Sequence, residues 1–253
     1  MKIVLIGAGN LATNLGKGLL QAGHEIAQVF SRTMESAGAL ADILGSKPIT
    51  DLAQVCNDAD IYILSVKDTV LEDVQRTLLK GREHVLMVHT AGSMKMDVLE
   101  ADRRGVFYPL QTFSKGKEVD FKEIPFFLEA NHEEDLAVMR ELAETLTDKI
   151  YVLSSNDRKW LHVAAVFGCN FVNHCYSMAA NLLEKHDIPF SVMLPLIAET
   201  AEKVKEIHPK DAQTGPAMRW DTNVMDRHLG LLNDQPDLQE IYRLFSEHIH
   251  KAQ

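Results

Sequence analysis

Over roughly the first 153 residues, short apolar runs alternate with segments in which apolar positions recur every three or four residues. The apolar runs predict strands at 2–6, 25–30, 60–66, 84–89, 105–108, 125–129 and 149–153. The periodic segments between them predict helices over 10–22, 34–44, 68–80 and 132–147. Repeated strand–helix–strand units are typical of a parallel, doubly wound α/β sheet, which binds ligands beyond the carboxyl ends of its strands.

The pattern changes near Ser154, after which no strand is predicted. Ser154 and Asp157 have the spacing of a capping box and mark a helix start. Helical patterns then fit 158–185, 189–207, 222–232 and 236–251. We therefore expect two domains, an α/β domain over 1–153 and an all-helical domain over 154–253.

The segment 160–183 is apolar on nearly every side of the predicted helix. A membrane span is not expected, because several of its polar side chains are too costly in lipid: His162, Asn170, Asn173, His174 and Asn181. Such a helix should be buried in protein. A small helical domain has little interior to surround it, so we expect a homodimer in which a second subunit covers this helix.

A glycine motif follows the first strand and opens the first helix. Gly7 permits a tight turn, Gly9 lets a pyrophosphate approach the backbone, and Ala12 allows the helix to pack closely on the strand. The helix start at Asn10 and Leu11 offers unpaired N–H groups and a partial positive charge to phosphates. This context favours a dinucleotide site of the Rossmann type over the alternative, a glycine-rich turn without a ligand.

The residues at the end of the second strand indicate which dinucleotide the site binds. An NAD enzyme places an acidic residue there for the ribose 2′-hydroxyl, but this chain has Ser31, Arg32 and Thr33. Arg32 can pair with a 2′-phosphate, and the two hydroxyls can donate hydrogen bonds to it. We therefore predict NADP as the cofactor. The alternative is a solvated Arg32 beside a helix cap at Thr33.

Charge and cysteine content exclude several classes of protein. The formal net charge of −10 argues against nucleic acid or an anionic membrane as the partner. The sparse cysteines Cys56, Cys169 and Cys175 argue against a disulfide framework and fit a reducing compartment. The first apolar run ends at Gly7 and is too short for a signal peptide. We expect a cytoplasmic protein.

Several segments make the chain resemble a known superfamily. They are Gly-Ala-Gly-Asn-Leu-Ala at 7–12, Ser-Arg-Thr at 31–33, Ser-Val-Lys-Asp at 65–68 and His-Thr-Ala-Gly-Ser at 89–93. These segments resemble those of pyrroline-5-carboxylate reductases, deazaflavin-dependent NADP oxidoreductases and β-hydroxyacid dehydrogenases. Those families join a Rossmann domain to a helical domain that dimerises. The resemblance implies that Val66, Lys67 and Thr90 also contact the cofactor.

Over nearly its whole length, the chain is similar to a group of Rossmann-type NADP oxidoreductases. That similarity includes Tyr-Pro-Leu-Gln-Thr-Phe at 108–113, residues 161–170, Thr-Gly-Pro at 214–216 and Arg-x-Asp at 219–221. One position departs from the pattern of the β-hydroxyacid dehydrogenases. Those enzymes carry a catalytic Lys four residues before an Asn; here Asn170 matches the Asn, but Val166 replaces the Lys. Reduction of a protonated imine is less affected, because such a substrate already carries its proton.

The long helix also carries the candidate catalytic groups. At 100° per residue, His162, Asn170, Asn173 and Ser177 form one polar stripe. We predict His162 as general acid with Asn170 beside it, and Thr90 and Ser93 on the Rossmann side of the same site. The alternative is that the stripe holds satisfied interface groups.

Ser93, Asn173 and Arg219 are predicted to bind the substrate. Arg219, expected on a loop after Thr214-Gly215-Pro216, can grip a carboxylate with two hydrogen bonds, or it can form a structural contact with Asp221. No metal site is expected, and Cys169 is expected to pack in the interior. Together these features predict an NADP-dependent oxidoreductase acting on a small, carboxylated imine or carbonyl compound. The alternative is a non-catalytic NADP-binding sensor or scaffold.

Overall fold

The computed structural model describes residues 1–252, which divide into two compact units. The first unit comprises 1–172, and the second begins at Asn173. The packing boundary therefore falls within the long helical segment, whereas the sequence places a boundary where the strands end, at 153/154. The boundary after residue 172 reflects how the residues pack, whereas the boundary at 153/154 reflects where the strands end and the helices begin.

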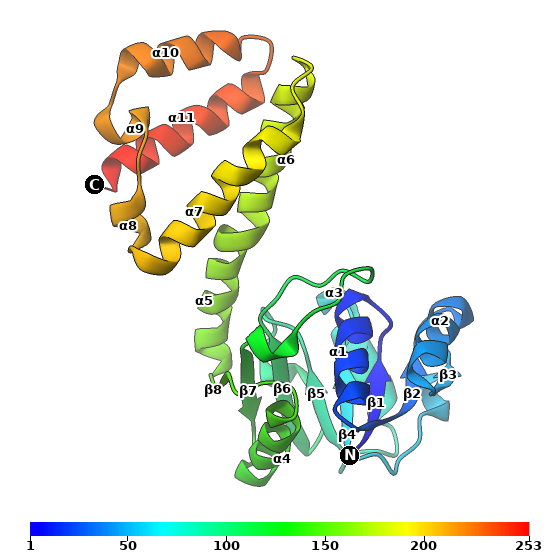
Figure 1. Cartoon of the computed structure of the whole chain (residues 1–253). Helices are drawn as coiled ribbons and strands as arrows, with labels where there is room; N and C mark the ends of the chain where they lie inside the picture. Colours follow the sequence, from blue (N-terminus) through cyan, green and yellow to red (C-terminus); the bar gives the residue numbers. More distant parts are fainter. Residues whose placement is uncertain (253) are drawn as a thin grey trace. The chain divides into compact units, whose positions relative to one another are not determined.

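The first unit is built on one eight-stranded sheet with the order β3-β2-β1-β4-β5-β6-β7-β8 (Figure 1). The strands are β1 (Lys2–Ile6), β2 (Glu25–Phe30), β3 (Lys47–Ile49), β4 (Ile61–Leu64), β5 (Leu86–His89), β6 (Arg103–Pro109), β7 (Phe126–Ala130) and β8 (Ile150–Val152). This order confirms the doubly wound, Rossmann-like fold, because the chain winds outward from β1 in one direction and from β4 in the other.

Two details of the sheet differ from the sequence prediction. The sheet is not wholly parallel, because β6 and β7 pair antiparallel. Their connection contains only the 3₁₀ turn η3 (Phe121–Glu123) instead of a crossover helix, and a return without a crossover gives antiparallel strands. The edge strand β3 was not predicted, because Lys47-Pro48-Ile49 has no apolar alternation, and a proline is tolerated only at such an edge.

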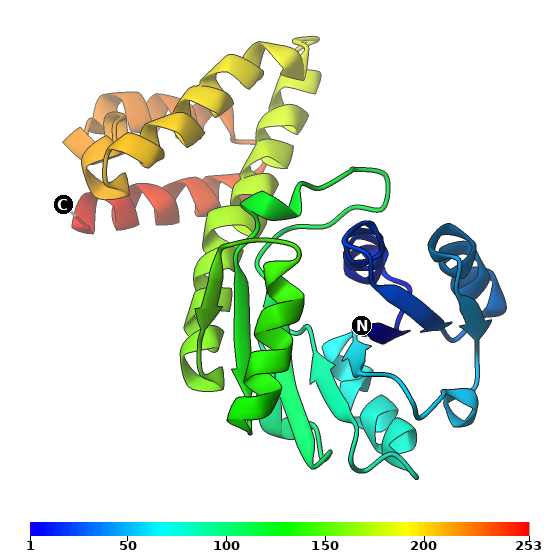
Figure 2. The ribbon, with the colours of Figure 1, turned by 60° about the horizontal axis from the view of Figure 1, so that its bottom comes forward.

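Helices cover both faces of the sheet (Figure 2). The helices of this part of the unit are α1 (Asn10–Gln21), α2 (Met34–Leu44), α3 (Asp68–Leu79) and α4 (Glu133–Glu144). Ile3 and Leu5 of β1 face the core made by α1, α2 and α4, whereas Val4 and Ile6 face the core made by α3. Because both faces are covered, the central strands are continuously apolar, as the sequence pattern indicates.

The long helical segment begins where the sequence places its cap. Ser154 Oγ accepts a hydrogen bond from the Asp157 backbone N–H at 3.2 Å and donates one to its carboxylate at 2.6 Å. The segment consists of α5 (Ser155–Ala165), a π-helical turn η4 (Val166–Phe171) and α6 (Val172–Glu184). Its apolar side chains are exposed in the single chain, Trp160 at 68% and Phe167 at 64%. Within the single chain, this helical segment is therefore not buried as the sequence predicts.

The second unit is helical, and between Ser154 and Ala252 no strand occurs. After α6 it contains η5 (Phe190–Met193), α7 (Leu194–Glu206), α8 (Pro209–Ala212), α9 (Pro216–Arg219), α10 (Thr222–Leu231) and α11 (Pro236–Lys251). From Asn173 to Ala252, the buried residues are Ala217, Met225 and Ser246. In residues 1–252, no helix is both long enough and apolar enough to span a membrane.

Candidate functional site

The turn between β1 and α1 has the geometry of a phosphate-binding loop. Gly7 adopts φ = +123°, and a Cβ at this position would overlap the carbonyl oxygen of Ser65 at the end of β4. A Cβ on Gly9 would meet no atom within 4 Å. Gly7 therefore closes the turn against the sheet, while Gly9 leaves its outer side free for a ligand.

The start of α1 has no side chain competing for its N–H groups. Gly9 is the N-cap residue, no side chain caps the helix, and its first turn holds no acidic residue. Ala12 is fully buried against the sheet, so helix and strand pack closely. These features fit a dinucleotide pyrophosphate, because unpaired helix N–H groups bind anions.

The end of β2 lies directly beside this turn. The Gly7 N–H donates to the Phe30 carbonyl oxygen at 2.9 Å, and the Ser31 N–H donates to Ile49 at 3.1 Å. Thr33 caps α2 by accepting from the Ser36 N–H at 3.3 Å, which is the structural role considered for it. Arg32 is exposed, and no carboxylate within residues 1–252 forms a salt bridge with it.

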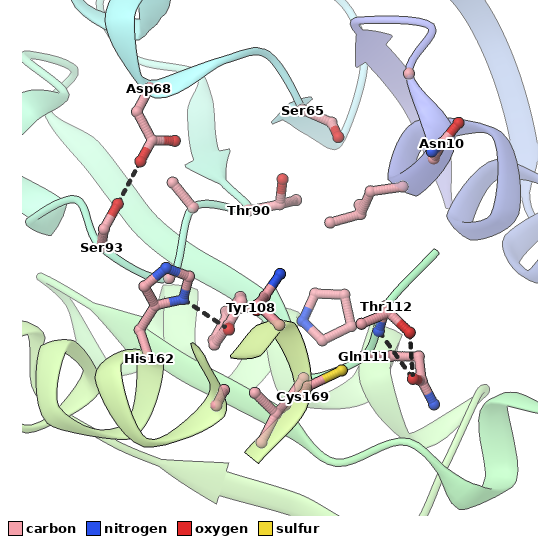
Figure 3. A pocket seen from close by; sticks show the side chains of 18 of the residues that line it. Asn10, Ser65, Asp68, Thr90, Ser93, Tyr108, Gln111, Thr112, His162 and Cys169 are labelled. Carbon is pink, nitrogen blue, oxygen red and sulfur yellow. Dashed lines mark hydrogen bonds between the residues drawn. The ribbon is translucent and has the colours of Figure 1, made fainter. Parts of the chain in front are cut away.

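A cavity of about 740 Å³ opens from the glycine turn across the carboxyl ends of β4, β5 and β6 (Figure 3). All of its lining residues belong to the first unit. Those predicted from the sequence are Gly9, Asn10, Leu11, Val66, Lys67, Thr90, Ser93, His162 and Asn170. The cavity thus joins the cofactor motif, the loops after two strands and the long helix.

The loop after β5 is held by a buried histidine. His89 Nδ1 accepts a hydrogen bond from the Ala91 N–H at 3.1 Å, so its Nε2–H donates to the Lys95 carbonyl oxygen, also at 3.1 Å. Burial, assisted by the positive charge of Arg158, lowers the pKa of His89 to about 4. The ring is therefore neutral near pH 7 and positions Thr90 and Ser93 at the cavity.

The polar stripe of the long helix is altered by the π-helical turn. A π turn widens the helix, so the angle between His162 and Asn170 is not that of a regular α-helix. Both residues nevertheless line the cavity. Asn173 and Ser177 belong to the second unit, and Ser177 donates to the Asn173 carbonyl oxygen within α6 at 3.2 Å.

Arg219 lies on a short helix and not on a loop, because Pro216 starts α9 and Arg219 is its last residue. Asp221 caps α10 by accepting from the Val224 N–H at 3.2 Å. Within residues 1–252, no salt bridge joins Arg219 to Asp221. Like Asn173, Arg219 belongs to the second unit and is not a lining residue of the cavity.

Sequence reasoning missed several groups at the cavity. Tyr108 near the end of β6 lies with its Oη 3.3 Å from Nδ1 of His162, and the Asp68 carboxylate accepts a hydrogen bond from the predicted Ser93 (Figure 3). Cys169, predicted to be packed in the interior, is exposed and lines the cavity, because the π turn carries it there. The position of Tyr108 at the carboxyl end of a strand was the available signal.

A buried ion pair fixes the helix that carries His162. Arg158 is 1% exposed and pairs with Glu129 of β7 at 2.5 Å. Arg158 also donates to the Met94 carbonyl oxygen at 2.6 Å, and Glu129 accepts from the Ser155 N–H at 2.9 Å. The pair therefore joins α5, the sheet and the loop after β5. Within residues 1–252, no group of three or more His, Cys, Asp or Glu side chains is arranged to hold a metal ion.

The fold and the glycine turn define a Rossmann-type dinucleotide-binding protein. The family model described as "NADP oxidoreductase coenzyme F420-dependent" matches residues 2–91, and a domain of unknown function, DUF2520, matches residues 124–249. No curated protein matches the chain.

One solved structure establishes the family. A putative NADP oxidoreductase from Bacteroides fragilis is 55% identical with a TM-score of 0.94, covering 99% of this chain and 98% of its own. The chain belongs to this NADP oxidoreductase family.

More distant structures share the fold. An imine reductase from Myxococcus stipitatus in complex with NADP⁺ is 15% identical with a TM-score of 0.73, covering 100% of this chain and 94% of its own. The 1-pyrroline-5-carboxylate reductase of Streptococcus pyogenes is 18% identical with a TM-score of 0.63, covering 99% and 98%, respectively.

Proposed function

We propose that this protein transfers a hydride between NADP(H) and a small, carboxylated imine or carbonyl substrate. The observation that carries the proposal is the single cavity bounded by the glycine turn at one end and by His162 and Asn170 at the other. A cavity with convergent polar groups, beyond the carboxyl ends of parallel strands, is where a doubly wound protein binds its ligands.

The cofactor is proposed to lie along Gly7, Gly9 and Ala12, with its pyrophosphate at Asn10 and Leu11. The open side of Gly9 and the uncapped start of α1 support this placement. The cavity loops contribute Val66, Lys67 and Thr90. NADPH, when bound, supplies the hydride.

NADP, and not NAD, is proposed because of the end of β2. Arg32 is exposed and without a carboxylate partner in the described chain, and the bond from Gly7 to Phe30 keeps this strand end beside the glycine turn. Arg32 and Ser31 would bind the 2′-phosphate, and the hydroxyl of Thr33 would combine its capping role with a further contact.

Catalysis is proposed to depend on His162 as the proton donor, with Asn170 and Ser93 holding the substrate beside it. All three line the cavity. A histidine is suited to this role because its unperturbed pKa lies near neutrality. Val166 in place of a catalytic lysine favours an imine over a keto acid, and the imine reductase and the pyrroline-5-carboxylate reductase of the same fold are consistent with that choice.

The second unit is proposed to pair with another copy of the chain, giving a homodimer. Nearly all of its side chains are exposed or half-buried, including Leu196 at 58% and Leu231 at 79%, so it lacks a core of its own. A self-complementary partner would bury these side chains. Asn173 and Arg219 of this unit are proposed to bind the substrate, Arg219 through the carboxylate. Light scattering should give twice 28.4 kDa; a stable monomer at micromolar concentration would refute the dimer.

The rival function is a non-catalytic NADP-binding sensor, favoured by the absence of the lysine at position 166. The deciding experiment screens NADPH oxidation against cyclic imines and small keto acids. We expect turnover with at least one compound, and none with Gly9→Asp, which places a carboxylate where the pyrophosphate binds. Tight NADPH binding without turnover on any compound would favour the sensor.

The screen also tests His162. With a carbonyl substrate, His162→Ala should reduce turnover by about 10²- to 10⁴-fold, whereas a protonated imine should show a much smaller loss. The exposed His84 is the matched control, and His84→Ala should retain full turnover. Unchanged reduction of a carbonyl substrate by His162→Ala would remove His162 from the mechanism.

A further inference from the structure

Tyr108 and His162 meet inside the cavity although they come from different elements. Tyr108 is the residue before the last in β6 and is 8% exposed, and its Oη lies 3.3 Å from Nδ1 of His162 on α5. The two rings meet edge to face with centroids 6.3 Å apart. The opposite edge of the imidazole faces the side of the cavity that holds Ser93 and Asp68 (Figure 3).

The close approach of this pair depends on the glycine between Ala91 and Ser93. A Cβ on Gly92 would lie 2.6 Å from Nδ1 of His162 and 2.8 Å from Oη of Tyr108. Distances this short do not occur between real atoms of these types, so any side chain at position 92 would displace one ring or the other. The loop after β5 is therefore shaped around the Tyr108–His162 contact.

The chemistry of the phenol decides which imidazole nitrogen carries hydrogen. Burial raises the pKa of Tyr108, although the charge of Arg158 opposes this, so the hydroxyl stays protonated near pH 7. A phenol O–H is a good donor, and the unprotonated nitrogen of a neutral imidazole is a good acceptor. Tyr108 therefore donates to Nδ1 of the neutral ring and leaves the hydrogen of the ring on Nε2.

We propose that Tyr108 is a positioning residue that keeps the Nε2–H of His162 directed into the cavity, toward the substrate atom that accepts the proton. The proposal rests on the proposed role of His162 as the acid. In the neutral ring Tyr108 donates to Nδ1, and in the protonated ring it accepts from Nδ1–H. In both charge states Nε2 bears a hydrogen on the edge away from Tyr108.

The proton transfer from His162 to the substrate needs only these groups and water. The proton leaves Nε2 of the protonated ring and bonds to the oxygen or nitrogen of the substrate, while the electron pair of the broken N–H bond remains on the ring. The transfer leaves the ring neutral with its remaining hydrogen on Nδ1, where it donates to Tyr108. This product tautomer differs from the resting neutral ring, in which Tyr108 donates to Nδ1 and Nε2 carries the hydrogen. Water returns a proton to Nε2 after the product leaves.

The test is ¹⁵N NMR of the imidazole nitrogens of His162, which needs no substrate. In the neutral wild-type ring, Nδ1 should resonate as an unprotonated nitrogen and Nε2 as a protonated one. In Tyr108→Phe both resonances should move toward their average, because the donor that fixes the tautomer is lost. The exposed Tyr151 supplies the matched control, and Tyr151→Phe should leave both resonances in place.

Gly92→Ala is the second variant, because it keeps the phenol but separates the rings. It should move the His162 resonances, whereas Gly116→Ala should not, since a Cβ on Gly116 meets no atom within 4 Å. Once a substrate is known, Tyr108→Phe should lower kcat by about tenfold, the loss of one hydrogen bond, with a smaller change in KM.

The two proposals can fail separately. Identical His162 resonances in wild type and Tyr108→Phe, or a wild-type neutral ring protonated on Nδ1, would overturn the positioning role even if the enzyme turns over. Resonances that respond as expected, with no turnover on any compound, would leave the Tyr108–His162 coupling intact and favour the sensor over the proposed reaction.

Discussion

The backbone of Ser65 occupies the space that a side chain at Gly7 would need. Gly7 also adopts φ = +123°, a conformation that other residues rarely reach. The end of β4 and the glycine turn are therefore in direct backbone contact, which brings the cofactor turn and the loop Val66–Lys67 to one rim of the cavity.

This contact makes Gly7 a stability determinant. Gly7→Ala should lower the free energy of unfolding by roughly 3 kcal/mol or more, because strain at positive φ adds to an overlap that backbone atoms cannot relieve. Urea unfolding measures the loss. Gly9→Ala is the comparison, since its Cβ meets open space and should leave stability nearly unchanged. Equal losses for both variants would contradict the assigned roles.

Replacing Arg32 should separate the two nicotinamide cofactors. Arg32→Ala should weaken NADPH binding by about 1–3 kcal/mol and leave NADH binding nearly unchanged, because only NADPH carries the 2′-phosphate. Fluorescence titration with both cofactors provides the measurement. Tighter binding of NADH than of NADPH by the wild type would exclude the NADP assignment.

The buried pair of Arg158 and Glu129 should be far more important for stability than pairs on the surface. Arg158→Met should cost about 3–5 kcal/mol, because it leaves the Glu129 carboxylate, which is only 17% exposed, without its counter-charge. Arg76 pairs with Glu72 and Glu100 at the surface and is 52% exposed, so Arg76→Met should cost less than about 1 kcal/mol. Similar losses of unfolding free energy for the two variants, measured in urea, would show that burial does not determine how much an ion pair contributes to stability.

His89 should make the protein less stable in mild acid. Burial lowers its pKa from 6.5 to about 4, so the unfolded chain binds a proton at a pH where the folded chain does not. The stability present above pH 6.5 should therefore fall by roughly 3 kcal/mol as the pH decreases toward 4.

Urea unfolding at several pH values measures this slope. His89→Gln should flatten the slope between pH 6.5 and 4, whereas the exposed His84 is the control and His84→Gln should retain it. A wild-type slope that His89→Gln leaves unchanged would assign the acid sensitivity to other groups.

Local sequence patterns predicted much of the fold because helix periodicity and helix capping depend on residues that are close in the sequence. The helix predicted at 34–44 has the bounds of α2, and the cap predicted at Ser154 starts α5. The π turn at Val166–Phe171 was not predictable in this way, since its apolar sequence also fits a regular helix. Because of this turn, counting 100° per residue does not give the true angle between His162 and Asn170 around the helix axis. Both residues nevertheless line the cavity.

The sequence alone determined the doubly wound architecture, the glycine turn and the helical second half, because strand burial, turn strain and helix capping act between neighbours in the chain. Only the tertiary structure decided the antiparallel pairing of β6 with β7, the burial of Arg158 against Glu129 and the approach of Tyr108 to His162. Each of these depends on contacts between residues separated by tens of positions. Their distances are set by how helices and loops pack on the sheet, and no local pattern records that packing.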